Sequence, residues 1–331
     1  MSPKPTDLPA PTVVPVPSMG AEDVVVAEDG TLYTGTEDGI VWALAPGTHE
    51  AREVGRLDGR PLGLELLPDG RVLVCDAHPR RGIFALDPRD GSWEELAREA
   101  EGVAFNVCNN AAVATDGTIF VSDSTQDFRL EEWRRDLVTD PGSGRLVRRD
   151  PDGTTTVVVR GLRFANGVAL APDESFVCVA QSTGRDVVRL WLTGPRAGEQ
   201  DVLLPDLPGY PDNISRGSDG LIWVTIGSPK VPLLELLLRL PAVVRRVAAR
   251  MPEPLQPDPA RTVRVQAYDV TGAAPRLVHD LDLDATDFHM VTGVREHHGR
   301  VWVASLVEAA VAYHDLADRE VSHGTPRGAG A

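Results

Sequence analysis

The stretch Asp116-Gly117-Thr118-Ile119-Phe120-Val121 joins a tight turn to a short strand of β-branched and aromatic residues. The same succession of turn and strand occurs six times along the chain, this stretch included. The turns are Asp29-Gly30, Asp69-Gly70, Asp116-Gly117, Asp173-Glu174, Asp219-Gly220 and His298-Gly299. Runs of four or five β-forming residues bounded by Gly, Pro and Asp indicate strands. A repeat of about 40 to 50 residues with four strands in each unit is typical of a β-propeller.

We therefore predict an all-β fold, a six-bladed β-propeller that spans residues 1–331 as a single domain. The chain ends soon after the third strand of the last repeat. A strand around Thr12 to Val16 would supply the fourth strand and close the ring, which removes the exposed strand edges. Residues 1–11 and 318–331 are expected to be flexible.

Two insertions interrupt the repeat with helical patterns, at residues 126–140 and 229–260, and they are expected to cap one face of the propeller. The second contains an apolar, arginine-rich run from Val231 to Met251, which predicts two short amphipathic helices broken at Pro241. One interpretation is a canopy whose apolar stripe packs over the propeller. The other is an apolar lid that recruits hydrophobic substrates or makes peripheral contact with a membrane.

Composition excludes several classes of protein. The chain has 331 residues and a formal net charge of −16 without a basic stripe, so we expect no nucleic-acid partner. No apolar stretch is long enough for a transmembrane segment. Cys75, Cys108 and Cys178 lie in apolar runs and are expected to be buried free thiols, which agrees with a cytoplasmic location.

Oxygen ligands recur at one position of the repeat. Eight residues before the second residue of each turn stand, in order, Glu22, Leu62, Asn109, Asn166, Asp212 and Val291. Equivalent positions of a propeller meet around a single axis. Two carboxylates and two carboxamides there predict a hard-cation site, which favours Ca²⁺, with another divalent cation such as Mg²⁺ or Mn²⁺ as the alternative.

Two motifs carry a resemblance to a known family. Phe164-Ala165-Asn166-Gly167 and Gly209-Tyr210-Pro211-Asp212-Asn213 resemble the strictosidine-synthase-like branch of the regucalcin/gluconolactonase/luciferin-regenerating-enzyme superfamily, with the likeness running from about Gly20 to Asp315. The resemblance implies a six-bladed propeller and a central divalent metal held by Glu22, Asn109, Asn166 and Asp212. It also implies hydrolysis of lactones or aryl esters, with Asp212 as both ligand and base.

The sequence departs from the resemblance at three positions. Thr292 replaces the glutamate that the alkaloid-forming synthase uses, so we do not expect its condensation chemistry. Val107 replaces an arginine with which sugar lactonases grip their substrate, so a sugar acid is not favoured. Leu62 replaces one histidine of a paraoxonase-like pair, leaving His78 alone.

Further candidates surround the predicted metal. His78 and His289 are candidate catalytic residues near the mouth of the site, although both also fit surface histidines. Asn110, Asn213 and Thr292 stand beside the ligand positions and are expected to support the bound cofactor.

Three functions fit this site. The first is a Ca²⁺-dependent hydrolase of a small apolar ester or lactone, in which the cation polarises the carbonyl and activates water. The second is a non-hydrolytic isomerase or cyclase that uses the same cavity. The third is a non-catalytic, metal-stabilised propeller that binds a ligand, because fold alone does not fix function.

Overall fold

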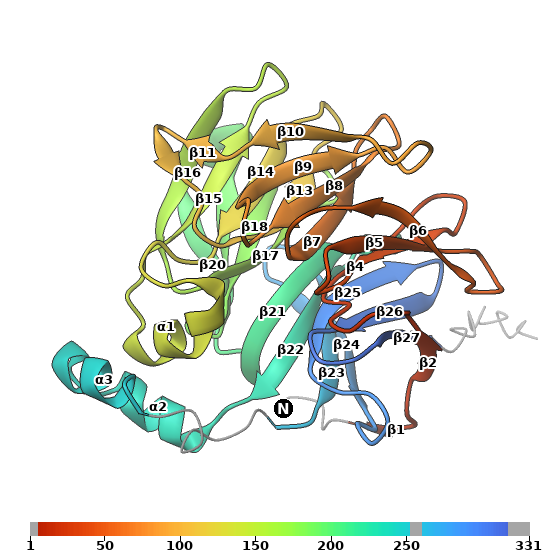
Figure 1. The fold of residues 1–331 in the computed structure, drawn as a ribbon. Helices are drawn as coiled ribbons and strands as arrows, with labels where there is room; N and C mark the ends of the chain where they lie inside the picture. Colours follow the sequence, from red (N-terminus) through yellow and green to blue (C-terminus); the bar gives the residue numbers. More distant parts are fainter. Residues whose placement is uncertain (1–5, 252–259, 317–331) are drawn as a thin grey trace, which may run out of the picture.

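Six antiparallel sheets surround one axis in the computed structural model, which describes residues 6–251 and 260–316 (Figure 1). Blade one consists of β3 (Val24–Val26), β4 (Leu32–Gly35), β5 (Ile40–Leu44) and β6 (Ala51–Arg56). Blade two consists of β7 (Pro61–Leu66), β8 (Val72–Asp76), β9 (Gly82–Leu86) and β10 (Trp93–Ala97). Blade three consists of β13 (Cys108–Val113), β14 (Ile119–Asp123), β15 (Gly144–Arg149) and β16 (Thr155–Leu162). The predicted six-bladed propeller is confirmed.

The other three blades follow the same order. Blade four consists of β17 (Ala165–Leu170), β18 (Phe176–Gln181), β19 (Asp186–Trp191) and β20 (Gln200–Leu204). Blade five consists of β21 (Gly209–Arg216), β22 (Ile222–Pro229), β23 (Val263–Asp269) and β24 (Arg276–Leu283). Blade six consists of β25 (Val291–His297), β26 (Arg300–Ser305), β27 (Ala310–Asp315) and β2 (Thr12–Pro15). A small hairpin, β11 (Glu99–Ala100) and β12 (Val103–Ala104), precedes blade three.

The N-terminal strand closes the ring as the sequence predicts. β2 pairs antiparallel with β27, in the register Val13 with Ala312 and Val14 with Val311. One further strand was not predicted: β1 (Thr6–Leu8) adds in parallel to β24 at the outer edge of blade five. The expected flexible tail at 318–331 lies outside the described residues.

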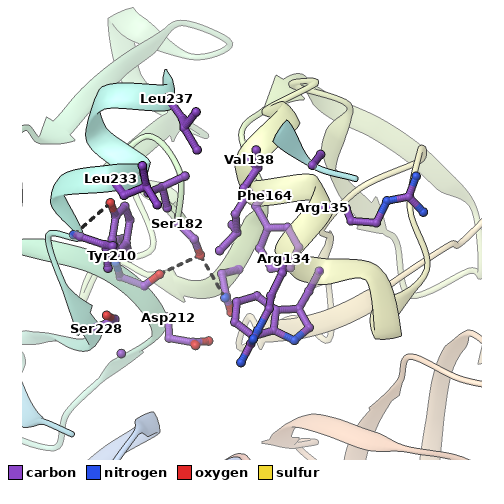
Figure 2. Close-up of a pocket in the computed structure, with 18 of the residues that line it drawn as sticks. Arg134, Arg135, Val138, Phe164, Ser182, Tyr210, Asp212, Ser228, Leu233 and Leu237 are labelled. Carbon is purple, nitrogen blue, oxygen red and sulfur yellow. Dashed lines mark hydrogen bonds between the residues drawn. The ribbon is translucent and has the colours of Figure 1, made fainter. Parts of the chain in front are cut away.

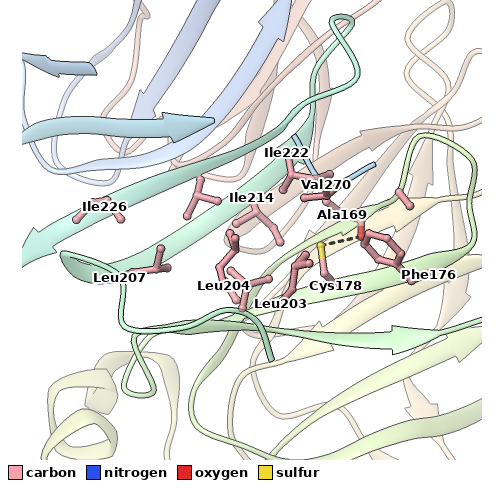
Figure 3. Close-up of a cluster of buried hydrophobic side chains, with 14 residues drawn as sticks. Ala169, Phe176, Cys178, Leu203, Leu204, Leu207, Ile214, Ile222, Ile226 and Val270 are labelled. Carbon is pink, nitrogen blue, oxygen red and sulfur yellow. Dashed lines mark hydrogen bonds between the residues drawn. The ribbon is translucent and has the colours of Figure 1, made fainter. Parts of the chain in front are cut away.

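The core consists of six main apolar clusters, each formed by the facing sides of two neighbouring blades. Figure 3 shows the cluster between blades four and five, where Phe176 and Leu204 meet Ile214 and Ile222. The cluster between blades six and one includes Val14 of β2, so the closing strand also contributes to the core. The three cysteines are buried and free, as predicted, and burial raises the pKa of the Cys178 thiol to about 12.

The helices arise from the two predicted insertions and gather on one face (Figure 1). The first insertion forms the short 3-10 turn η1 (Leu130–Glu132) and α1 (Trp133–Thr139). The second forms α2 (Pro232–Leu238) and α3 (Ala242–Ala248), with Pro241 at the N-cap of α3. A second 3-10 turn, η2 (Gly194–Arg196), lies in blade four. α1 packs against both α2 and α3, and no helix among the described ranges is long and apolar enough to cross a membrane.

We expect the contact between blades four and five to be sensitive to a single added methyl group. A Cβ atom on Gly167 would lie 2.0 Å from the backbone nitrogen of Ile214, so Gly167→Ala forces a backbone shift between the two blades. We expect a loss of about 2–4 kcal/mol in the free energy of unfolding, measured by urea titration. Gly272→Ala is the control, because its Cβ would lie 3.6 Å from the nearest atom in an exposed turn. Equal midpoints for the two variants would contradict the expectation.

Candidate metal centre and cavity

A β-bulge occurs at the same place in five of the inner strands. In each, the inner strand has one more residue than its neighbour between two paired positions. For example, Cys108 pairs with Asp123 and Ala111 with Val121, so two residues on the inner strand lie opposite one on its neighbour. The bulged pairs are Leu62-Gly63, Asn109-Asn110, Asn166-Gly167, Asp212-Asn213 and Thr292-Gly293. In blade one, Glu22-Asp23 directly precede β3. A bulge breaks the alternation of side chains, so consecutive residues can both turn toward the axis.

These pairings correct the predicted position in blade six. Counting from the turn selected Val291, but Thr292 is the residue equivalent to Asp212. The reason is the length of the turn: His297 pairs directly with Arg300, whereas Arg216 pairs with Ile222 across a longer loop in blade five. The count from the turn glycine is therefore shifted by one residue.

Three of the four predicted ligands present oxygen atoms that lack hydrogen-bond partners. Glu22, Asn109 and Asn166 are buried, and Asp212 is half-buried at the cavity. Glu22 Oε2, Asn109 Oδ1 and Asn166 Oδ1 have no hydrogen-bond partner. A buried polar atom without a partner costs about 1–3 kcal/mol. Unpaired oxygens from three blades are the donors that a hard divalent cation requires, so these residues fit the predicted metal.

The electrostatics of the two carboxylates agree with that assignment. Burial raises the pKa of Glu22 well above its usual range, and the charges of Asp23 and Asp212 raise it further. Burial raises the pKa of Asp212 to about 7, against a hydrogen bond from Asn166. Both acids are therefore poorly stabilised as anions without a counter-charge, which a divalent cation would supply.

The donor set also argues against zinc. Among the described residues, no group of three or more His, Cys, Asp and Glu side chains is arranged to hold a metal ion. Two carboxylates with two carboxamides match calcium chemistry better than the nitrogen and sulfur ligands of zinc sites.

A second ring of side chains supports the ligands. At the second bulge position, three Asx residues alternate with three glycines around the axis: Asp23, Gly63, Asn110, Gly167, Asn213 and Gly293. The glycines are required by space, because a Cβ on Gly63 or Gly293 would lie within 2.7 Å of Asn110 or Asp23 respectively. Each glycine thus leaves room for an Asx side chain from another blade.

Asn110 and Asn213 belong to this ring, and Thr292 stands at the first bulge position of blade six. Asn110 Nδ2 donates to Asp23 Oδ2 at 3.0 Å, and Asn110 Oδ1 accepts the N–H of Val168 at 3.0 Å. Asn213 Nδ2 donates to Glu22 Oε1 at 3.1 Å, and the Thr292 hydroxyl donates to the backbone oxygen of Glu22 at 2.6 Å. Two of the three predicted supporting residues therefore hold Glu22 in place.

Sequence reasoning did not select Asp23. This buried carboxylate accepts hydrogen bonds from the N–H of Val24 and of Leu64, and burial raises its pKa to about 6. The sequence feature that could have identified Asp23 is its position directly after Glu22. Asn110 and Asn213 likewise directly follow the predicted metal ligands Asn109 and Asp212.

The two candidate histidines lie outside the lining of the cavity that contains Asp212. The His78 side chain is 54% exposed and its Nε2 lies 4.0 Å from Glu131 Oε1. His289 Nδ1 contacts Glu308 Oε1 at 2.5 Å. Neither residue lines the cavity described next, so the structure gives neither a direct route to the reacting atoms.

An apolar cavity of about 190 Å³ has Asn166 and Asp212 in its lining. Figure 2 shows Asp212 among the residues that surround it. Residues of α1, α2 and α3 form its walls together with Phe164 and Tyr210. The wall residues include Trp133, Leu137, Val138, Leu233, Leu234 and Leu237. Such a site would accept a small hydrophobic molecule whose polar group reaches the two oxygen ligands.

Three polar contacts fix the helices over the cavity. Glu235 of α2 accepts a hydrogen bond from Tyr210 Oη at 2.9 Å and pairs with Arg185 at 3.2 Å. Arg245 of α3 pairs at 3.2 Å with Asp140, the residue that caps the C-terminus of α1. The insertions therefore form a cover whose inner side belongs to the site.

Comparison with known proteins agrees with this architecture. Residues 40–232 match the SMP-30/Gluconolactonase/LRE-like region, and residues 12–44 match the strictosidine synthase-like N-terminal family. Protein STRICTOSIDINE SYNTHASE-LIKE 10 of Arabidopsis thaliana is 30% identical over 279 residues, which cover 80% of this chain and 72% of the relative. The adipocyte plasma membrane-associated protein of Homo sapiens is 30% identical over 314 residues, covering 87% and 73% respectively.

Solved structures share the fold at low sequence identity. A gluconolactonase from Xanthomonas campestris superposes with a TM-score of 0.66 at 16% identity, covering 96% of this chain and 99% of that one. The calcium-binding protein regucalcin from Agrobacterium tumefaciens gives 0.64 at 13% identity, covering 93% and 94%. The family assignment rests on the sequence matches, and by them this chain belongs to the SMP-30/gluconolactonase/LRE-like family, in its strictosidine synthase-like branch.

Proposed function

We propose that this protein is a divalent-metal-dependent hydrolase, with Ca²⁺ as the favoured ion, and that it acts on small apolar lactones or aryl esters. The observation that carries the proposal is the set of unpaired buried oxygens of Glu22, Asn109 and Asn166 beside Asp212. Asn166 and Asp212 also line an apolar cavity, where an ester carbonyl could meet them.

The residues would divide the chemistry among them. A cation held by Glu22, Asn109, Asn166 and Asp212 would supply Lewis-acid polarisation of the carbonyl and lower the pKa of water. Asp212 is half-buried and lines the cavity, and its carboxylate would accept the proton of the attacking water. The apolar walls would orient the acyl or aryl group and exclude bulk water from the reacting ester.

The name of the relatives supports a second candidate. The strictosidine synthase-like proteins give their branch the name of a synthase, and the same cavity could serve a non-hydrolytic isomerisation or cyclisation. Thr292 in place of a carboxylate speaks against the condensation that the resemblance would suggest. Product analysis in isotopically labelled water separates the two candidates, because only hydrolysis incorporates solvent oxygen.

Removal of the metal tests the proposal directly. We expect a strong chelator to abolish hydrolysis of phenyl acetate and simple lactones, and added Ca²⁺ to restore it. Since a ligand that binds only the folded state stabilises it, the melting temperature should also fall, by about 3–8 °C on loss of a well-saturated ion. Full activity after exhaustive chelation would refute a metal-dependent reaction.

Substitution of Asp212 separates the site from the scaffold. We expect Asp212→Ala to lose hydrolysis by a factor of about 1,000 or more and to weaken Ca²⁺ binding in calorimetry, since it removes both a ligand and the base. The matched control is Asp58→Ala, which removes an exposed carboxylate outside the cavity lining. Near-normal turnover in Asp212→Ala would eliminate this residue from the mechanism.

The free energy of unfolding of the metal-free protein should decrease as pH rises, which is the opposite of the usual effect of a buried aspartate that is stabilised as an anion. The pKa of Asp212 is about 7 in the folded protein, compared with the ordinary 3.8, so the folded state binds more protons between these values. Stability should therefore decrease as pH rises from about 4 to about 7. Melting temperatures measured in chelator should show this slope, and Asp212→Asn should reduce it.

Other buried acids contribute a slope of the same sign, including Asp136, whose pKa burial raises to about 7. The decisive quantity is therefore the difference between Asp212→Asn and the parent protein. Identical slopes for the two proteins would show that Asp212 does not titrate in this range.

A further inference from the structure

Exposed apolar side chains concentrate on the outer side of α2 and α3. Most of the large hydrophobic residues with high exposure in the described part of the chain lie on these two helices: Leu233, Leu236, Val243, Val244 and Val247. Val243 is 70% exposed, Val247 64% and Leu236 58%. A concentration of exposed apolar residues on one small element marks an interaction surface more often than scattered single residues do.

The two sides of α3 differ in what they contact. Arg245 pairs with Asp140 of the first insertion, while Ala248 and Ala249 line the cavity. Val243 and Val247 lie four residues apart, so they share the opposite, solvent-facing side. One side of α3 therefore contacts the first insertion and the cavity. The other side is apolar and has no partner in the described part of the structure.

The charge of this surface is opposite to that of the protein. The run from Val231 to Met251 contains Arg239, Arg245, Arg246 and Arg250 but a single acid, Glu235, whereas the whole chain carries −16. Arg239, Arg246 and Arg250 are exposed. Arg246 follows Val243 by three residues on α3, a spacing that brings the two side chains together on the helix surface, and Arg250 lies in the turn directly after α3.

We propose that the outer side of α2 and α3 docks on a membrane surface that contains anionic lipids. The exposed valines and Leu236 would enter the boundary between headgroups and acyl chains, and Arg239, Arg246 and Arg250 would meet the lipid phosphates. A basic apolar patch on an acidic protein also fixes the orientation, because the remaining surface is repelled by the same lipids. The inner side of these helices would then open the cavity toward the source of apolar substrates.

Vesicle sedimentation tests the proposal without any assumption about catalysis. We expect the full chain to bind vesicles with about a third phosphatidylserine and to bind phosphatidylcholine vesicles at least about tenfold more weakly. Binding should weaken with added salt because exposed charges are screened. Equal binding to both kinds of vesicle, or binding to neither, would overturn the proposal.

Matched variants distinguish this surface from the rest of the protein. Val243→Asp and Val247→Asp should each lower vesicle affinity about tenfold or more, whereas Val202→Asp, at a position 50% exposed on blade four, should not. Arg246→Gln and Arg250→Gln should each lower it about fivefold, compared with no change for the exposed Arg52→Gln. Equal effects of the surface variants and their controls would contradict the assignment.

Two further measurements distinguish membrane docking from loss of folding and from self-association. Val247→Ser, which retains a small neutral side chain, should lower vesicle affinity while leaving the melting temperature within about 2 °C of the parent. Light scattering of the free protein tests the competing occupant: a dimer that Val243→Asp dissociates would assign the surface to a second copy and overturn the membrane proposal. Hydrolysis of a water-soluble ester should be unchanged in these variants, so failure of docking and failure of the hydrolase proposal are separable.

Discussion

The bulge at the start of the inner strands is the constraint on which the candidate site depends. In a regular strand, only every second side chain could face the axis, so one blade would offer either a ligand or a supporting residue. With one extra residue in the strand, Asn109 and Asn110 are both buried near the axis. Asn109 keeps its oxygen unpaired, while Asn110 links Asp23 to the backbone of blade four.

This arrangement would couple binding of the proposed metal to closure of the ring. Glu22 belongs to blade one, yet its side chain accepts from Asn213 of blade five and its backbone from Thr292 of blade six. Without a cation, the raised pKa values of Glu22 and Asp212 show that buried negative charge is held at a cost. A cation bound by blades one, three, four and five would remove that cost at the axis, where a propeller has no continuous strand to join opposite blades.

Local sequence signals were sufficient for most of the fold and failed where geometry depends on a partner. Turn and strand patterns repeat within each blade, so the blades, the closing strand near Thr12 and both helical insertions could be predicted from short stretches. The position in blade six was wrong because the two-residue turn between His297 and Arg300 shortens the count. Asp23 was missed because only one residue per repeat was considered. The bulge turns a second residue of each repeat toward the axis, and Asp23 stands at that second position, as Asn110 and Asn213 do. The placement of His78 and His289 outside the cavity depends on loop paths that carry no periodic signal.

The insertions unite the cavity and the outer surface in one structural element. Glu235 and Arg245 hold α2 and α3 to the body of the protein through Tyr210, Arg185 and Asp140, so a displacement of the helices would alter the cavity directly. Leu233 illustrates the connection, because it lines the cavity and is also 44% exposed. Leu233 thus presents apolar surface both to the cavity and to the outer side of α2. Burial of apolar surface would drive both the binding of these helices to a lipid surface and the transfer of an apolar molecule into the cavity. The apolar character of the helices would therefore also favour entry of hydrophobic esters over sugars.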